Sequence, residues 1–144
     1  MMIDDIILNK KESIERCIRQ IKLYYALPSE KPFEEDFMRQ DAIALNLQRA
    51  CEQAIDLANH LIKIHKFGLP KESRESFAIL AERGVIDRLL AKNLQGMVGF
   101  RNTLVHQYQS LNLGIVIAVI EQHLDDLIAF TNCAINYQKQ DGNT

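Results

Sequence analysis

Residues 43–62 have the sequence Ile-Ala-Leu-Asn-Leu-Gln-Arg-Ala-Cys-Glu-Gln-Ala-Ile-Asp-Leu-Ala-Asn-His-Leu-Ile. Apolar side chains recur in it every three or four residues, which is the period of one face of an α-helix. This stripe consists of Ile43, Leu47, Ala50, Ala54, Leu57, Ala58, Leu61 and Ile62. A helix is therefore predicted over about 34–66, between the Pro28–Pro32 break and Gly68-Leu69-Pro70. At 1.5 Å per residue it would be roughly 50 Å long, so it needs partners along its whole length.

Four further helices are predicted on either side of this long helix. They cover about residues 3–25, 71–83, 87–108 and 113–137, with Gly84 as a C-terminal cap and Asp87 as an N-cap. No segment shows the alternation typical of a strand. The sequence predicts an all-α fold, with residues 1–144 forming a single domain built as an antiparallel bundle of about five helices. The residues from about 139 onward are expected to form a disordered tail.

Composition and charge narrow the possible functions. The 144 residues carry a formal net charge of −2, so the whole-molecule field does not attract nucleic acid, and any polyanion has to be held locally. Cys17, Cys51 and Cys133 lack metal-ligand spacing and predict no disulfide framework. An acidic N-terminal segment and the absence of a long apolar run predict a cytoplasmic protein without a membrane span.

The candidate site is Arg101-Asn-Thr-Leu-Val-His106-Gln-Tyr108, within the predicted helix 87–108. Arg101 falls on the helix's apolar stripe, with Leu94, Met97, Val98, Leu104, Val105 and Tyr108. Because an unpaired guanidinium is costly to bury, Arg101 needs a partner or a wet cleft, and Glu52 and Asp56 are available on the helix 34–66. His106 lies about 140° further around the helix, on the side of Asn102.

Arg101 and His106 can also have purely structural roles. From spacing alone, a structural salt bridge at Arg101 and a helix-terminal histidine at His106 are favoured over an active site. Asp56 and His60 are too few ligands to predict a metal site, and Asn59 and His60 are expected to line the dimer or the contact with the helix 87–108. Gly96 and Gly99 are interpreted as positions where packing requires a missing side chain. The basic residues of the first helix are interpreted as a solvated surface: Lys10, Lys11, Arg16, Arg19 and Lys22.

The pattern Arg-x4-His-x-Tyr at residues 101–108 resembles the motif of HepT-type toxins of the HEPN superfamily. Residues 50–60, Ser73-Arg-Glu-Ser-Phe77 and residues 94–102 resemble the same family in the same order, so the likeness covers nearly the whole chain. It implies a dimeric helical bundle that cleaves RNA without a metal ion or cofactor. By position, Arg101 and His106 would be the catalytic pair and Asn102 a polar orienter, with Glu52 and Asp56 as supporting carboxylates.

The same resemblance implies a regulatory partner. HepT-type toxins are paired, in type VII toxin–antitoxin systems, with a small MNT-type nucleotidyltransferase antitoxin, which would transfer AMP from ATP to Tyr108. Cleavage through the 2′-hydroxyl of RNA needs both a base and an acid. One chain supplies one histidine in the motif, so a composite site in a homodimer is expected. The alternative is a non-catalytic subunit that presents a nucleotide or substrate to a nucleotidyltransferase.

Overall fold

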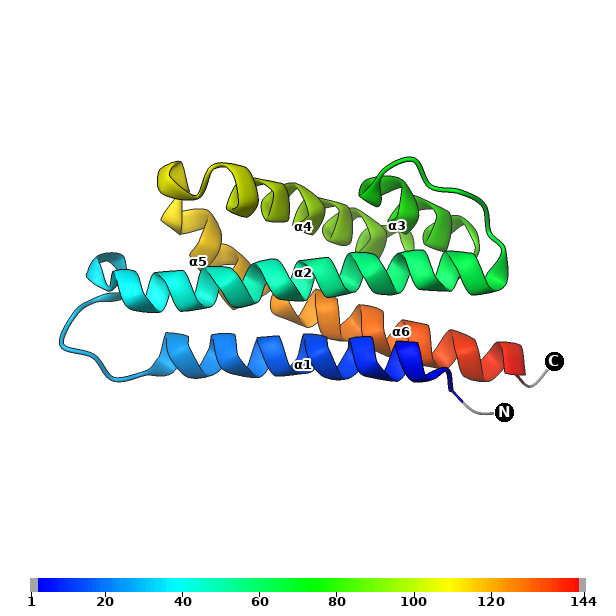
Figure 1. Ribbon diagram of the computed structural model, residues 1–144, viewed down its shortest axis with the longest axis horizontal. Coiled ribbons are helices and arrows are strands. Elements are labelled where there is room, and N and C mark those ends of the chain that lie inside the picture. The colour runs from blue at the N-terminus through cyan, green and yellow to red at the C-terminus, as the bar shows by residue number, and fades with distance from the viewer. Residues whose placement is uncertain (1–2, 143–144) are drawn as a thin grey trace.

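The computed structural model describes residues 3–142, and its framework is helical throughout (Figure 1). Six α-helices follow one another: α1 Asp5–Ala26, α2 Phe37–His65, α3 Ser73–Glu82, α4 Arg88–His106, α5 Leu113–Gln122 and α6 Leu124–Gly142. Two 3-10 turns lie between them, η1 Phe33–Glu35 and η2 Tyr108–Ser110. No strand occurs among these residues, which confirms the all-α prediction.

The long helix α2 organises the bundle. It runs along the long axis of the molecule, with α1 on one side and α3 and α4 on the other (Figure 1). Helix α6 packs against α1, α2 and α4 and closes the core. The apolar stripe of α2 is buried as expected, and the largest fully buried side chains of the protein include Ile43, Leu47, Leu57 and Leu61. Because α2 and α4 pack together, Arg101 of α4 lies within reach of a side chain of α2.

Short polar side chains cap the starts of α1, α2 and α4. Asp36 Oδ1 accepts from the Arg39 amide at 3.1 Å, and Asp87 Oδ1 accepts from the Leu90 amide at 2.7 Å. Both are N-cap bonds that satisfy a first-turn donor with no intrahelical partner, and the prediction for Asp87 is confirmed. Asp4 caps α1 in the same way through Ile6.

His60 of α2 has a structural role at the cap of α1. Asp4 Oδ2 lies 2.8 Å from His60 Nε2, and Asn59 Oδ1 accepts from the buried Ser76 hydroxyl at 2.6 Å. Desolvation opposes ionisation of Asp4, but the hydrogen bonds from His60 and Ile6 outweigh it and lower the pKa of Asp4. His60 and Asn59 thus join α2 to the start of α1 and to α3. Both bonds lead to α1 and α3 rather than to α4, and the expected place of these residues at a dimer interface stays a prediction.

Several predicted boundaries need correction. The predicted helix 34–66 begins only at Phe37, after η1, and the predicted helix 87–108 ends at His106. The predicted helix 113–137 is divided at His123 into α5 and α6, which gives six α-helices in the described part rather than five. Helix α6 continues to Gly142, so the residues after 139 are helical at least that far. The last two residues of the expected tail, 143–144, lie outside the described residues.

Gly84 and Gly96 are expected to respond oppositely to replacement by alanine. Gly84 has φ +76° and closes α3, since its amide bonds to Ala81 O at 3.1 Å and the Val85 amide to Leu80 O at 2.9 Å. Gly96 lies inside α4 with nothing within 4 Å of an added Cβ, so the predicted need for a missing side chain there is wrong. Gly84→Ala should lower the free energy of unfolding by about 1 kcal/mol, and Gly96→Ala should raise it by about 0.5–1 kcal/mol. Urea denaturation of both variants tests the pair, and equal shifts of one sign would contradict it.

Candidate functional site

Arg101 lies between the core and solvent, and its guanidinium reaches across to α2. Its Nη2 donates to Glu52 Oε2 at 3.1 Å, and its Nη1 donates to Asn102 Oδ1 at 3.1 Å. The Arg101 and Glu52 side chains are 30% and 35% exposed, so the ion pair is partly accessible to solvent. Exposed ion pairs contribute only about 0.2–1 kcal/mol, so a phosphate oxygen can compete with Glu52 for this guanidinium. The buried Nε of Arg101 has no hydrogen-bond partner among residues 3–142.

His106 is the last residue of α4 and is exposed, with no side-chain hydrogen bond in the described part of the chain. Helix α4 is continuous from Arg88 to His106, so the angle of about 140° between Arg101 and His106 holds. Asn102 lies four residues before His106, on the same side of the helix, and it accepts the bond from Arg101. Asn102 therefore holds the Arg101 guanidinium toward the side of the helix on which His106 lies.

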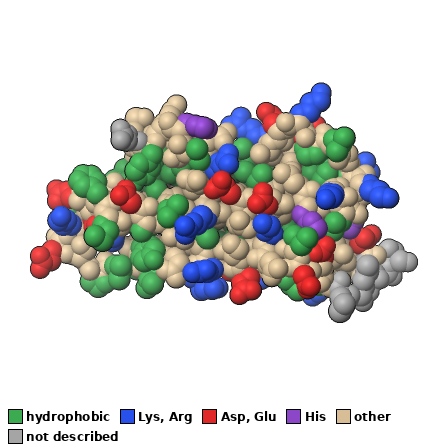
Figure 2. Space-filling model, in the orientation of Figure 1, with side chains coloured by type: hydrophobic (Ala, Val, Ile, Leu, Met, Phe, Trp, Pro, Cys, Tyr) green, Lys and Arg blue, Asp and Glu red, His purple; other side chains and the backbone are tan. Residues whose placement is uncertain are grey.

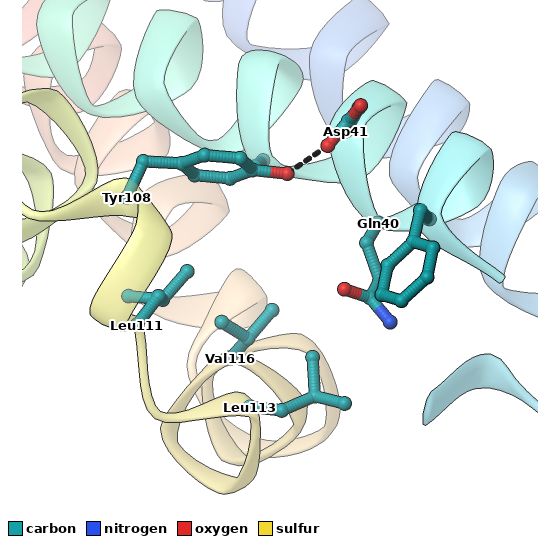
Figure 3. Close-up of a pocket in the computed structure, with 8 residues that line it drawn as sticks. Gln40, Asp41, Tyr108, Leu111, Leu113 and Val116 are labelled. Carbon is teal, nitrogen blue, oxygen red and sulfur yellow. Dashed lines mark hydrogen bonds between the residues drawn. The ribbon is translucent and has the colours of Figure 1, made fainter. Parts of the chain in front are cut away.

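Tyr108 does not continue the helix as predicted. The chain leaves α4 at Gln107, which has φ −134° and ψ 32°, and Tyr108 opens η2. Val105, which was expected on the buried stripe, is 41% exposed. The Tyr108 hydroxyl points to α2 and donates a hydrogen bond to the Asp41 carboxylate (Figure 3). The periodicity of the segment missed this turn because Leu104 and Tyr108 have the four-residue spacing of a helical face.

Partial burial and the hydrogen bond to Asp41 raise the pKa of Tyr108 to about 12. The phenol is therefore neutral at physiological pH, and its oxygen needs a proton acceptor before it can act as a nucleophile. The Asp41 carboxylate already accepts the hydrogen bond of this hydroxyl and is placed to take its proton. It is a functional candidate that the sequence did not reveal, since 67 residues separate it from Tyr108.

Two hollows adjoin the Tyr108 ring. The first has a volume of about 250 Å³, between the start of α2, η2 and the start of α5 (Figure 3). It is lined by Phe37, Gln40, Asp41, Ala44, Tyr108, Leu111, Leu113 and Val116. The second, of about 230 Å³, shares Asp41, Ala44 and Tyr108 and is completed by Leu45, Gln48 and Leu104. A group attached to the Tyr108 oxygen thus has space close to the ring on this chain.

The two predicted carboxylates separate in the structure. Glu52 meets Arg101, whereas Asp56 lies 3.5 Å from Lys10 of α1 and is more than half exposed. Within residues 3–142, no three His, Cys, Asp or Glu side chains gather as a metal site requires. The same residues include no helix with the length and apolar character needed to span a membrane.

Comparisons with known proteins agree over most of the chain. Residues 14–134 match the family described as "Ribonuclease HepT-like". The mRNA nuclease HepT of Shewanella oneidensis is 47% identical over 127 residues, which cover 88% of this chain and 94% of that protein. A solved structure of the tri-AMPylated Shewanella oneidensis HEPN toxin in complex with MNT antitoxin has a TM-score of 0.85 and 46% identity, and covers 91% of this chain and 97% of that one. A toxin–antitoxin structure with AMP-PNP has a TM-score of 0.84 and 45% identity over 90% of this chain and 97% of that one.

Proposed function

Because the chain belongs to the family of HepT-like ribonucleases, we propose that it is the toxin of a type VII toxin–antitoxin pair and cleaves RNA at Arg101 and His106 without a metal ion. The observation that supports this site is the arrangement at the end of α4. It combines an exposed histidine, an arginine held by a displaceable carboxylate, and Asn102 between them. A cytoplasmic location, where RNA is available, is part of the same proposal.

The proposed reaction uses the RNA itself as the nucleophile. The 2′-oxygen forms a bond to the neighbouring phosphorus while the bond from phosphorus to the 5′-oxygen breaks, which leaves a 2′,3′-cyclic phosphate and a 5′-hydroxyl. The 2′-proton passes to a base and the 5′-oxygen receives a proton from an acid. A histidine, with an ordinary pKa near neutrality, can serve in either role. Arg101 stabilises the additional negative charge on the phosphorane oxygens.

The proposed active unit is a homodimer. One chain places a single histidine, His106, at the end of α4, and the other described histidines are elsewhere: His60 on Asp4, His65 beside Asp141 and His123 on Asp126. A two-fold axis brings a second Arg101 and His106 into one cleft, so that one histidine acts as base and the other as acid.

Tyr108 is the proposed point of control. A cognate MNT-type nucleotidyltransferase attaches AMP to its oxygen: the phenol oxygen bonds to the α-phosphorus of ATP, pyrophosphate leaves, and the phenol proton passes to Asp41. The hydrogen bond from Tyr108 to Asp41 supports this assignment. The added phosphodiester and base would lie two residues beyond His106, where they compete with RNA.

Tyr108→Phe tests the control site directly. The variant keeps the ring but lacks the oxygen, so it should gain no AMP when mixed with ATP, Mg²⁺ and the cognate partner, as measured by intact mass. RNA cleavage by the variant in EDTA should persist and should no longer be suppressed by the partner and ATP. Tyr137→Phe is the matched control, because that ring packs against His65 and Phe67 away from the site. Full AMP incorporation by Tyr108→Phe would refute the assignment.

A further inference from the structure

Helix α4 carries no acidic residue along its whole length. Its 19 residues include Arg88, Lys92 and Arg101 and no Asp or Glu, in a protein whose formal net charge is −2. Asp87, the residue before the helix, is its N-cap, and the carboxylate accepts a hydrogen bond from the Leu90 amide. The helix that bears the proposed catalytic residues thus has three positive side chains and no negative one.

Two basic and two amide side chains of α4 share its outer face with His106, whereas Arg101 lies on another side of the helix. Arg88, Lys92, Gln95, Gly99, Asn102 and His106 follow one another at intervals of three and four residues, so they lie within about 80° of one another around the helix. Core residues such as Leu94, Met97 and Leu104 occupy the opposite side. Between Arg88 and His106 the face is roughly 27 Å long, and Arg88, Lys92, Asn102 and His106 are exposed on it.

Arg74 of α3 adds a third cation to this face by lying directly on α4. Its Nη2 atom is 2.6 Å from the point where a Cβ would stand on Gly99, so a side chain there would displace the guanidinium. Gln95 Nε2 donates to Arg74 O at 2.9 Å and holds its backbone. No ion pair to Arg74, Arg88 or Lys92 occurs among the described residues. The missing side chain at position 99, expected from the sequence, thus leaves room for the guanidinium of Arg74 on α4.

Beyond Gln95 the face opens into a groove between α3 and α4 with a volume of about 400 Å³. Arg88, Lys92 and Gln95 line it together with Ala78, Ala81, Glu82 and Ala91. Glu82 is the single carboxylate among these lining residues, against two cations. Lys, Arg and His side chains are visible along the upper edge of the molecule in Figure 2, where α3 and α4 lie.

We propose that this outer face of α4, extended by Arg74, binds the phosphate backbone of the RNA strand that is cut at His106. The inference rests on the proposed ribonuclease function and adds where the substrate strand lies on the protein. Cations spaced along one face contact phosphates without selecting a base sequence. The face gives an acidic protein the local attraction that its overall charge does not provide. Two such faces would repel each other across a dimer, and an RNA strand between them removes that repulsion.

The test is the salt dependence of RNA binding. Full-length protein carrying His106→Ala, which prevents cleavage, is titrated with a fluorescent single-stranded RNA in EDTA at several salt concentrations. The variant Arg74→Gln, Arg88→Gln, Lys92→Gln removes three charges from the α4 face. Arg16→Gln, Arg19→Gln, Lys22→Gln removes three from α1 and is the matched control. The α4 variant should bind more weakly to every sequence, and its slope of log affinity against log salt should fall by about 2, at roughly 0.7 per lost phosphate contact.

Two further readouts separate a phosphate path from a loss of structure or of general charge. Gly99→Ala keeps every charge but displaces the Arg74 guanidinium, and it should also weaken RNA binding while leaving the helical circular dichroism unchanged. With His106 restored, the triple α4 variant should lose kcat/KM on RNA, and the loss should grow with the length of the RNA, whereas the α1 variant should keep the parental kcat/KM. Equal slopes for the α4 and α1 variants, or weakened dimer or antitoxin binding with unchanged RNA binding, would overturn the proposal. If the parent protein binds RNA through this face but does not cleave it, the proposed ribonuclease function is refuted, whereas the proposed RNA-binding face is retained.

Discussion

His106→Ala is expected to lower the rate of RNA cleavage in EDTA by about 100- to 10,000-fold, the usual contribution of a positioned acid or base. The imidazole is exposed at the end of α4 and makes no side-chain bond within residues 3–142, so its removal disturbs no internal contact. Thermal stability should therefore stay near that of the parent. The measurement is the initial rate on single-stranded RNA, together with identification of a 2′,3′-cyclic phosphate end.

The control for this loss is another partly exposed histidine. His123→Ala removes an imidazole that pairs with Asp126 between α5 and α6, and it should leave the cleavage rate unchanged.

Specific activity should also fall on dilution below the dissociation constant of the proposed dimer, because in the proposed composite site each half lacks one of the two proton-transfer groups. Parental cleavage by His106→Ala, or by a variant shown to be monomeric, would refute the composite site.

Asp41→Asn is expected to slow the transfer of AMP to Tyr108 by about 100- to 10,000-fold, again the range for a general base. The amide can hold the phenol by a hydrogen bond, but it cannot accept its proton. RNA cleavage should be unaffected, since Asp41 contacts Tyr108 and not Arg101. The experiment follows intact mass over time with saturating ATP, Mg²⁺ and the partner enzyme.

The pH dependence separates a base from a structural contact. Burial and the Asp41 carboxylate raise the pKa of Tyr108 to about 12 in the parent; without the carboxylate, the phenol ionises at lower pH. The rate of Asp41→Asn relative to the parent should therefore increase as the pH rises from 7 to 9, by up to about tenfold per unit if the phenolate becomes the nucleophile. Asp125→Asn, an exposed carboxylate of α6, is the control. A ratio that does not change with pH would show that Asp41 only positions the ring.

The sequence predicted what is encoded locally. The buried stripe of α2 and the Asp87 cap appear as spacing and as a capping residue, and both are present in the structure. The resemblance supplied the motif residues. Glu52 and Asp56, however, lie four residues apart on one helix, and only the rotation of α2 against α4 decides that Glu52 meets Arg101.

The sequence did not predict contacts between segments that are far apart in the chain. Asp41 meets Tyr108 only because the chain turns at Gln107 and crosses back to the start of α2. Gly99 was recognised as unusual, but the reason is Arg74 on a different helix. Gly96, with the same local context, has no such neighbour, so helix propensity alone could not tell the two glycines apart.

The bond between Tyr108 and Asp41 has a mechanical consequence for the proposed modification. It fastens the connection between α4 and α5 to the start of α2. An oxygen esterified with AMP has no proton to donate, and its phosphodiester places a second negative charge beside the carboxylate. The hydrogen bond is then lost, and the phosphodiester and the Asp41 carboxylate repel each other at a point two residues after His106. The repulsion, which Tyr108→Phe does not introduce, would push the connection after α4 away from α2, so that modification would shift the chain next to His106 as well as block access to it.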